Sequence, residues 1–525
     1  MPKPRDTSSA PHVGIIGAGI GGLAAAARLS HAGLRVTVLE RHSGPGGKMR
    51  VIDSVAGPVD AGPTVLTMKP VFDALFADLG ERIEDHLTLT PETVLARHFW
   101  SDGAQLDLMA DRAESTANIR DVFGKKAAAQ FERFAKRAAA LFDAFDTPMM
   151  QAARPSQLEL TRRVLRQPSL IAAMAPHRSL ATALNAQFSE PKLAQLFGRY
   201  ATYVGGRPEA SPAILSLIAD AEARGVWCVK GGMHQLARAL ERLAKARGAS
   251  FHFGQDVTKI KQASDGGFDV TSGSGSDRFD RILFNGDPRA LRKGLSPQAV
   301  TDTQTEPRSL SAYVHSFAAT PSDVPLAGHN VFFGETPEGE FGPLAKGAMP
   351  HDPTLYICAQ DRFAGHRPTG PERFEIIMNG PPAADGARAT EEEKSTCQTL
   401  ILARLARFGL RFGPTPQLET LTTPAEFGQL FPATNGSLYG RSPHGLMAAF
   451  KRPTALTAIP GLYLVGGGAH PGAGVPMATI SAKHAAEAIL NDLTSTSTSR
   501  RAATHGGISM ASATTARVPS QSSVS

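Results

Sequence analysis

The chain has 525 residues, 42% of them hydrophobic, which is enough for two or three sub-structures sharing contacts. Its formal net charge is +7, but only 6% of residues are aromatic and no Lys/Arg block interleaves with them, which excludes a stacking surface for nucleic acid. Cys228, Cys358 and Cys397 are far apart and lack CxxC spacing, which argues against a disulfide framework and a metal site. This cysteine pattern fits a reducing, cytoplasmic compartment best. The N-terminus is polar and no apolar run is long enough to cross a membrane, so no membrane-spanning segment is expected.

The chain begins with the pattern of a strand, a tight turn and a helix. Val13–Ile16 is apolar, a glycine-rich turn follows, and an Ala- and Leu-rich stretch runs from Leu23 to Ala32 before Gly33. A second strand is predicted over 34–39. A complete βαβ unit therefore closes within about thirty residues, as dinucleotide-binding motifs require.

Three glycines of this turn and the two residues at the end of the second strand have distinct predicted roles. Gly17 allows the tight bend, Gly19 lets the backbone approach a pyrophosphate, and Gly22 permits close packing of helix on strand. Glu40 ends the second strand, where its carboxylate can accept hydrogen bonds from ribose hydroxyls. Arg41 could hold the 2′-phosphate of NADP, but Glu40 would repel that phosphate. FAD and NAD both remain open on this motif alone.

A basic, glycine-rich turn follows directly and favours a flavin over a nicotinamide. Residues 41–50 contain Gly47 and Lys48, so backbone N–H groups and cations can meet phosphates there. A plain surface loop with solvated charges is the alternative reading.

The remaining elements are predicted from periodicity, in chain order. An amphipathic helix is expected over 127–145, more helices follow to about 225, and a helix over 234–247 leads into a strand at 250–253. Residues 290–435, rich in Pro and Gly, suit short strands of a separate sheet. A last strand over 462–465 precedes a glycine-rich turn and a helix over 478–493, and the Ser- and Thr-rich tail from Ser495 is expected to be disordered.

These elements predict an α/β fold, with α+β character in the substrate part. We expect a Rossmann-like FAD-binding domain, a mixed-sheet substrate domain and a helical, membrane-facing lid. The expected limits are 11–90, 225–290 and 435–494 for the FAD-binding domain, 91–115 and 291–434 for the sheet domain, 116–224 for the lid and 495–525 for the tail.

Both ends of the chain carry extended motifs. GAGIGGLAAAARLSHAGLRVTVLERHSGPGGKM resembles the N-terminal signature of the flavin-dependent amine oxidase and phytoene desaturase superfamily. GLYLVGGGAHPGAGVP, which spans Gly461–Pro476, resembles the closing signature of bacterial-type carotenoid desaturases. The resemblance covers nearly the whole chain to Leu493 and predicts that the two glycine turns meet in space.

The resemblance implies FAD as cofactor and assigns further contacts to it. Val257 would contact adenine through its backbone, although core packing of this β-branched residue is an equal alternative. Thr64, in the segment Asp60–Thr64, would lie near the flavin edge. The pyrophosphate and isoalloxazine would be approached by the turn that contains Gly466, Gly467, Gly474 and Val475.

A desaturase also needs a group that accepts a proton. Asp60 and His470 are the candidates nearest the flavin-associated motifs, and Asn285 with Asp287 is a further pair. His470 could instead fix its turn by hydrogen bonding. No metal is expected.

One departure from the family pattern bears on the substrate. Phytoene-converting members usually have glycine after the closing signature, whereas this chain has Met477, which resembles the branch acting on 1-hydroxy or 1-methoxy acyclic carotenoids. The expected reaction is C3–C4 desaturation of such a carotenoid. The alternatives are a phytoene-type desaturase or carotenoid isomerase, a flavin amine oxidase, and a lipid carrier of the same fold without flavin. Oxygen and a quinone both remain open as the electron acceptor.

The segment 154–180 is predicted to meet a membrane surface. Basic and apolar residues alternate in it, which suits an interfacial anchor, and Pro168 and Pro176 would interrupt a long helix. We therefore expect peripheral association with the inner or intracytoplasmic membrane, where a lipophilic carotenoid resides; a lid packed on the protein's own core is the alternative. The basic residues are Arg154, Arg162, Arg163, Arg166 and Arg178, among Leu158, Leu160, Val164, Leu165, Leu170 and Ile171.

Overall fold

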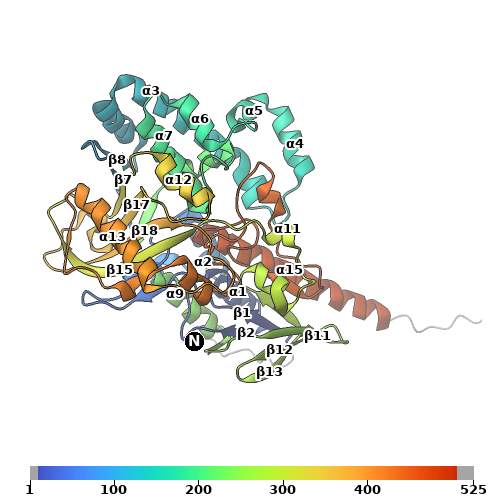
Figure 1. Cartoon of the computed structure of the whole chain (residues 1–525). Coiled ribbons are helices and arrows are strands. Elements are labelled where there is room, and N and C mark those ends of the chain that lie inside the picture. The colour runs from blue at the N-terminus through green and yellow to red at the C-terminus, as the bar shows by residue number, and fades with distance from the viewer. Residues whose placement is uncertain (1–9, 505–525) are drawn as a thin grey trace, which may run out of the picture.

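A five-stranded parallel sheet forms the base of the molecule in the computed structural model, which describes residues 10–504 (Figure 1). The predicted βαβ unit is present, with β1 (His12–Ile16) and β2 (Arg35–Glu40) joined by α1 (Ile20–His31). The strand order is β10-β2-β1-β14-β21, and every pairing is parallel. The Val-, Ile- and Leu-rich strands suit a sheet that is covered on both faces. The other three strands are β10 (Ser250–Phe253), β14 (Arg281–Phe284) and β21 (Leu462–Leu464).

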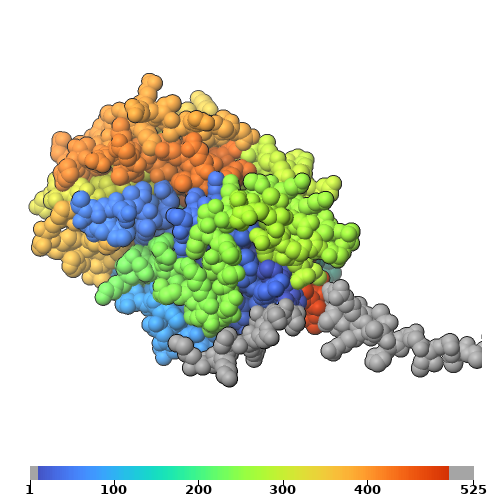
Figure 2. Space-filling model, turned by 90° about the horizontal axis from the view of Figure 1, so that it is seen from below, coloured from blue at the N-terminus to red at the C-terminus, as the bar shows by residue number. Residues whose placement is uncertain are grey.

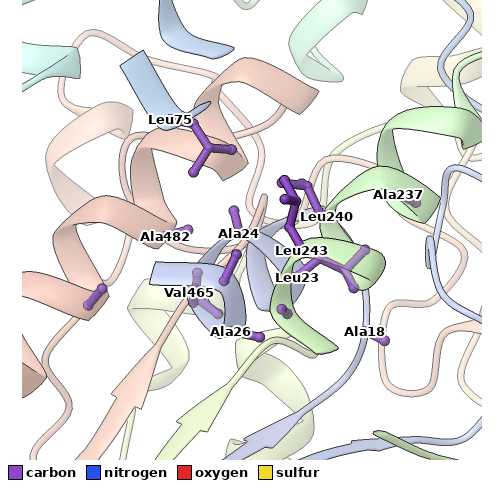
Figure 3. Packing of buried hydrophobic residues seen from close by; sticks show 14 of the residues in the cluster. Ala18, Leu23, Ala24, Ala26, Leu75, Ala237, Leu240, Leu243, Val465 and Ala482 are labelled. Carbon is purple, nitrogen blue, oxygen red and sulfur yellow. The ribbon is translucent and has the colours of Figure 1, made fainter. Parts of the chain in front are cut away.

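Helices from three distant parts of the chain cover one face of this sheet. α1 packs against α9 (His234–Ala246) and α15 (Val475–Thr504), and their side chains form one buried cluster (Figure 3). The alanine run Ala24–Ala27 on α1 is fully buried, and these short side chains let the helices approach closely. The first turn of the chain is therefore held in place by its middle and its end.

A mixed eight-stranded sheet forms the second layer. Its order is β19-β15-β18-β17-β16-β7-β8, with β20 paired to β15, and all pairings are antiparallel except β7 with β16. Thus the sheet joins strands that lie more than 200 residues apart. The strands are β7 (Val94–Phe99), β8 (Gln105–Met109), β15 (Ser311–Pro321), β16 (His329–Phe332), β17 (Leu355–Ala359), β18 (Glu372–Gly380), β19 (Phe412–Gly413) and β20 (Leu421–Thr422).

The central strand β18 shows how the two faces of this sheet differ. Phe374, Ile376 and Met378 join a core cluster with α13 (Glu391–Arg407), which covers that face. Because side chains alternate along a strand, Glu375 and Ile377 face the opposite way, toward the parallel sheet. The face that matters for function is therefore the one turned away from α13.

The helices of 112–223 gather at the far end of the molecule from β11–β13 (Figure 1). Phe131, Phe134, Leu141 and Phe145 of α3 are buried, as its periodicity predicts, and α3 is kinked at Gly124. Pro168 opens a new helix, so the predicted interruption is present. The helices are α3 (Arg112–Phe145), α4 (Gln157–Arg166), α5 (Pro168–Met174), α6 (Leu180–Gln187), α7 (Pro191–Gly198) and α8 (Leu217–Ala223).

Smaller elements complete the fold. Seen from below, segments from the beginning, middle and end of the chain share one surface (Figure 2). Three small antiparallel sheets are formed by β3 (Val51–Ile52) with β4 (Val59–Asp60), by β5 (Leu66–Thr67), β9 (Val226–Val229) and β6 (Leu89–Pro91), and by β11 (Lys259–Gln262), β12 (Phe268–Ser272) and β13 (Gly275–Phe279). The remaining α-helices are α2 (Lys69–Asp78), α10 (Pro288–Ala290), α11 (Asp302–Thr305), α12 (Pro337–Ala345) and α14 (Pro424–Leu430).

The C-terminal helix is longer than predicted. α15 begins at Val475 and continues to Thr504, past the expected end at Leu493, because no Gly or Pro interrupts the chain between Met477 and Thr504. The rest of the tail expected to be disordered, 505–525, lies outside the described residues. Among residues 10–504, no helix is long and apolar enough to span a membrane.

Candidate functional site

The two glycine turns predicted to meet are in contact. The amide of Asn285, directly after β14, donates to the carbonyl of Gly17 over 3.1 Å. A Cβ on Gly21 would lie 2.9 Å from the Cα of Gly466, which follows β21. Since β1, β14 and β21 are parallel neighbours, their carboxyl ends place both turns at one edge of the sheet, which is where such folds bind ligands.

The first turn leaves no room for side chains. A Cβ on Gly22 would lie 2.1 Å from the Gly17 carbonyl oxygen, and one on Gly19 would lie 3.0 Å from the Asn285 amide nitrogen. Gly17 has φ 101°, a left-handed conformation that favours glycine. α1 begins right after Gly19 without a side-chain cap, so its first N–H groups and its dipole are available to an anion.

A cavity of about 410 Å³ opens between this turn and the eight-stranded sheet. Most of the predicted cofactor residues line it, and it continues to Glu375 and Ile377 on β18. Gly22, Asp60, Thr64 and His470 lie outside its lining. The predicted residues that line it are Gly17, Gly19, Glu40, Arg41, Gly47, Lys48, Val257, Gly466, Gly467, Gly474 and Val475.

Glu40 and Arg41 mark one end of the cavity. The buried Glu40 carboxylate accepts hydrogen bonds from the backbone N–H groups of Ala18, at 2.5 Å, and His42, at 2.8 Å. Arg41 lies 3.6 Å from the carboxylate of Asp256. The carboxylate at the end of β2 is thereby fixed beside the glycine turn, where a ribose would lie.

Lys48 brings a cation into the cavity. Its ammonium donates to the carbonyl of Leu438 over 2.6 Å. Burial lowers the pKa of Lys48 to about 8, and the nearby Asp287 carboxylate opposes that shift. A charge in this place can balance the negative charge of a bound phosphate or flavin.

Asp60, Thr64 and His470 each hold other parts of the chain. Asp60 accepts from the backbone N–H of Met233 over 2.7 Å, and burial raises the pKa of its carboxyl. Thr64 shares a hydrogen bond with the Tyr356 hydroxyl at 2.9 Å. The ring Nε2 of His470 lies 2.9 Å from the Ala152 carbonyl oxygen, and burial lowers the pKa of this histidine to about 4.

Sequence reasoning missed two residues at this site, the half-buried Arg452 and the fully buried Glu375. Arg452 donates to the carbonyls of Gly467, Tyr439 and Arg441 over 2.9, 2.8 and 2.8 Å, and so ties the last glycine turn to the preceding loop. No local motif surrounds it. Glu375 lines the cavity, and its signal was a single acidic residue inside the otherwise apolar run 374–378.

Asp287, named from the sequence together with Asn285, forms a buried ion pair. Its carboxylate lies 2.5 Å from the guanidinium of Arg308, and both side chains are 5% exposed. We expect Asp287→Asn to lower the free energy of unfolding by about 3 kcal/mol, because it leaves a buried charge unpaired. Urea denaturation measures this loss. Asp302→Asn, which breaks the exposed pair with Arg292, should cost far less; equal losses would contradict the prediction.

These features define the class of the protein. A glycine cradle that a Cβ would fill, an open helix N-terminus and a fixed carboxylate at the end of β2 fit an adenine dinucleotide. The cavity lining includes Glu40 at the end of β2 and Glu375 and Ile377 on the second sheet, so both sheets contribute to the site. The site is that of a dinucleotide-dependent oxidoreductase.

The family follows from comparison with known proteins. A profile described as "Flavin containing amine oxidoreductase" matches residues 20–490, and the chain belongs to this family of FAD-dependent oxidoreductases. A hydroxyneurosporene desaturase of Cereibacter sphaeroides is 52% identical over 93% of this chain and 99% of its own length. A hydroxyneurosporene desaturase of Rhodobacter capsulatus is 49% identical over 91% of this chain and 97% of its own length. A 1-hydroxycarotenoid 3,4-desaturase of Flavobacterium sp. is 29% identical over 91% of this chain and 98% of its own length.

Solved structures show the same fold at lower identity. A putrescine oxidase variant aligns with a TM-score of 0.59 at 17% identity and covers 92% of this chain and 99% of its own. Cyclohexylamine oxidase from Brevibacterium oxydans aligns with a TM-score of 0.56 at 18% identity, over 92% and 100%. At this identity the likeness concerns the fold alone.

Proposed function

We propose that this protein is an FAD-dependent desaturase of acyclic carotenoids, acting at C3–C4 of a 1-hydroxy or 1-methoxy carotenoid. The observation that carries the proposal is the 52% identity to a hydroxyneurosporene desaturase over nearly the full length of both chains. Met477, which directly follows the closing motif in the first turn of α15, also favours this branch.

The cavity suits the cofactor and the chemistry. When bound, FAD supplies a hydride acceptor strong enough for an unactivated C–H bond. The protein must orient the chain and exclude water, and Val314 and Ile377 offer an apolar wall for this. We propose that the cofactor is held by Gly17, Gly19, Gly22, Glu40, Arg41, Gly47, Lys48, Thr64, Val257, Gly466, Gly467, Gly474 and Val475.

We also propose that the lid binds a membrane surface peripherally, on its cytoplasmic side. α4 packs on the lid's own cluster through Leu160 and Val164. Its other side exposes Leu158 (60%) and Leu165 (66%), which are seven residues apart and so share one helix face. α4 and α5 lie at one corner of the molecule (Figure 1). A lipophilic substrate resides in a membrane and an interfacial helix binds a membrane surface, so both favour association of the protein with the membrane.

The test is a product analysis. Purified protein supplied with FAD and a 1-hydroxy carotenoid in liposomes, with oxygen or a quinone as acceptor, should lengthen the conjugated system and red-shift the absorption spectrum. Parallel incubations contain phytoene, and amines with detection of hydrogen peroxide. Conversion of phytoene without conversion of the hydroxylated carotenoid would refute the substrate branch. Peroxide from amines, with no carotenoid product, would refute the desaturase.

A further inference from the structure

Glu375 is a fully buried acid at the inner end of the cavity. It lies in the middle of β18, with 0% exposure, on the face turned away from α13. Gly62 and Tyr439 line the same cavity, and Ile377 is the next side chain of β18 on this face. The opposite end of the cavity is marked by Glu40 and Val257. The fold therefore places a buried carboxyl group in the cavity wall, next to the apolar Ile377.

Neither oxygen of the Glu375 carboxyl group has a hydrogen-bond partner within residues 10–504. Directly opposite on β15, the hydroxyl of Ser316 is buried and also lacks one. On its other side, β17 places Cys358 opposite. Buried polar side chains are nearly always paired, so an unpaired carboxyl facing a cavity indicates a group that meets its partner there.

The surroundings of Glu375 favour its neutral form. Burial raises the pKa of the Glu375 carboxyl well above its ordinary range; the Asp60 carboxylate adds to this, and the Arg50 guanidinium opposes it. The other titratable groups facing it are the Cys358 thiol and the Tyr356 and Tyr439 hydroxyls, all uncharged at neutral pH. A buried carboxyl without a hydrogen-bond partner destabilises the fold, and proteins keep such carboxyls where function needs them.

We propose that Glu375 accepts the proton that leaves the substrate during desaturation. This inference rests on the proposed function. Two adjacent carbons each lose a hydrogen: the substrate gives one, with its electron pair, to the bound flavin and the other, as a proton, to the Glu375 carboxylate. The electron pair of the second C–H bond becomes the new C=C bond. Glu375 ends as a carboxylic acid and releases its proton before the next cycle.

Asp60, the acid favoured by the sequence, is less suited to this step. Its carboxylate accepts the Met233 N–H, and a Cβ on Gly232 would lie 2.7 Å from its Oδ2, so it is enclosed at the start of α9. The Met233 N–H already occupies the Asp60 carboxylate, whereas neither Glu375 oxygen has a hydrogen-bond partner within residues 10–504.

The sign of the pH dependence follows from the raised pKa. Only the ionised carboxylate can accept a proton, so turnover should increase as pH rises through the raised pKa of Glu375 and level off above it. A base with an ordinary carboxyl pKa would give a flat profile at neutral pH.

The test compares Glu375→Gln, Glu375→Asp, Asp60→Asn and the matched control Glu340→Gln in the holoenzyme. Glu340 is equally buried with a raised pKa, but Asn379 donates to it over 2.7 Å and it lies outside the cavity lining. We expect Glu375→Gln to lower kcat about 100-fold or more while FAD content and carotenoid binding stay normal. Glu375→Asp should retain part of kcat and the rise with pH, and Glu340→Gln should keep the wild-type profile.

Infrared difference spectra recorded against pH provide a readout without turnover. Wild-type, Asp60→Asn and Glu340→Gln protein should show the carbonyl stretch of a carboxylic acid free of hydrogen bonds, which fades as pH rises and is absent from Glu375→Gln. Absence of this band from the wild type, or full kcat in Glu375→Gln, would overturn the inference. If the band is present but the wild type desaturates no carotenoid, the proposed function is refuted. The band would still show that Glu375 is a neutral acid without a hydrogen-bond partner.

Discussion

Gly22→Val is expected to raise the Kd for FAD by about 100-fold or more. A Cβ at this position would meet the Gly17 carbonyl oxygen at 2.1 Å, a backbone atom that cannot move without shifting the turn. A clash of this kind in a packed site costs about 3 kcal/mol, which corresponds to about a 100-fold loss of affinity. The protein should purify without flavin absorbance, and fluorescence titration with FAD measures the change in Kd.

Gly44→Val is the matched control for this prediction. Gly44 lies in the neighbouring glycine-rich turn after β2, and no atom lies within 4 Å of a Cβ built on it. Its variant should bind FAD as the wild type does. Circular dichroism distinguishes loss of the cofactor from loss of the fold. Normal FAD affinity in Gly22→Val, or equal losses in both variants, would show that the predicted cradle does not hold the cofactor.

The glycine cradle was predictable because its signals are local. The residues from β1 to Glu40 specify a strand, a turn, a helix and a strand without help from the rest of the chain. The meeting of the two glycine turns, which the structure shows at Gly21 and Gly466, was predicted too, although only through the family motif at the far end. The periodicity of α9 and the strand at β10 were read in the same way.

The inner end of the cavity was not predictable, because its contacts are distant in sequence. β7 pairs with β16 across more than 200 residues, and no sequence pattern gives that partner or the strand order. Glu375 becomes a cavity residue only because α13 covers the other face of β18. Arg452 likewise acts on Gly467 and Tyr439 through backbone carbonyls, which carry no sequence signature.

Leu158→Asp combined with Leu165→Asp is expected to weaken binding to anionic vesicles by 100-fold or more. Both leucines are largely exposed on one face of α4, and Arg162, Arg163 and Arg166 on the same short helix are exposed as well. Each leucine that enters the headgroup boundary contributes about 1.5 kcal/mol or more, and the added aspartates oppose the attraction of the arginines to lipid phosphate. Co-sedimentation with vesicles measures the partition.

Val55→Asp is the control for the leucine variants, since Val55 is 90% exposed in the loop between β3 and β4. If exposed apolar area alone drove vesicle binding, Val55→Asp would weaken binding as much as the leucine variant does. If α4 forms the contact, Val55→Asp should bind vesicles as the wild type does. Salt separates the contributions further, because screening weakens the arginine attraction and leaves the apolar contact. Equal vesicle binding by the leucine variant and the wild type would mean that α4 is a solvated lid, and that the carotenoid enters the cavity from another surface.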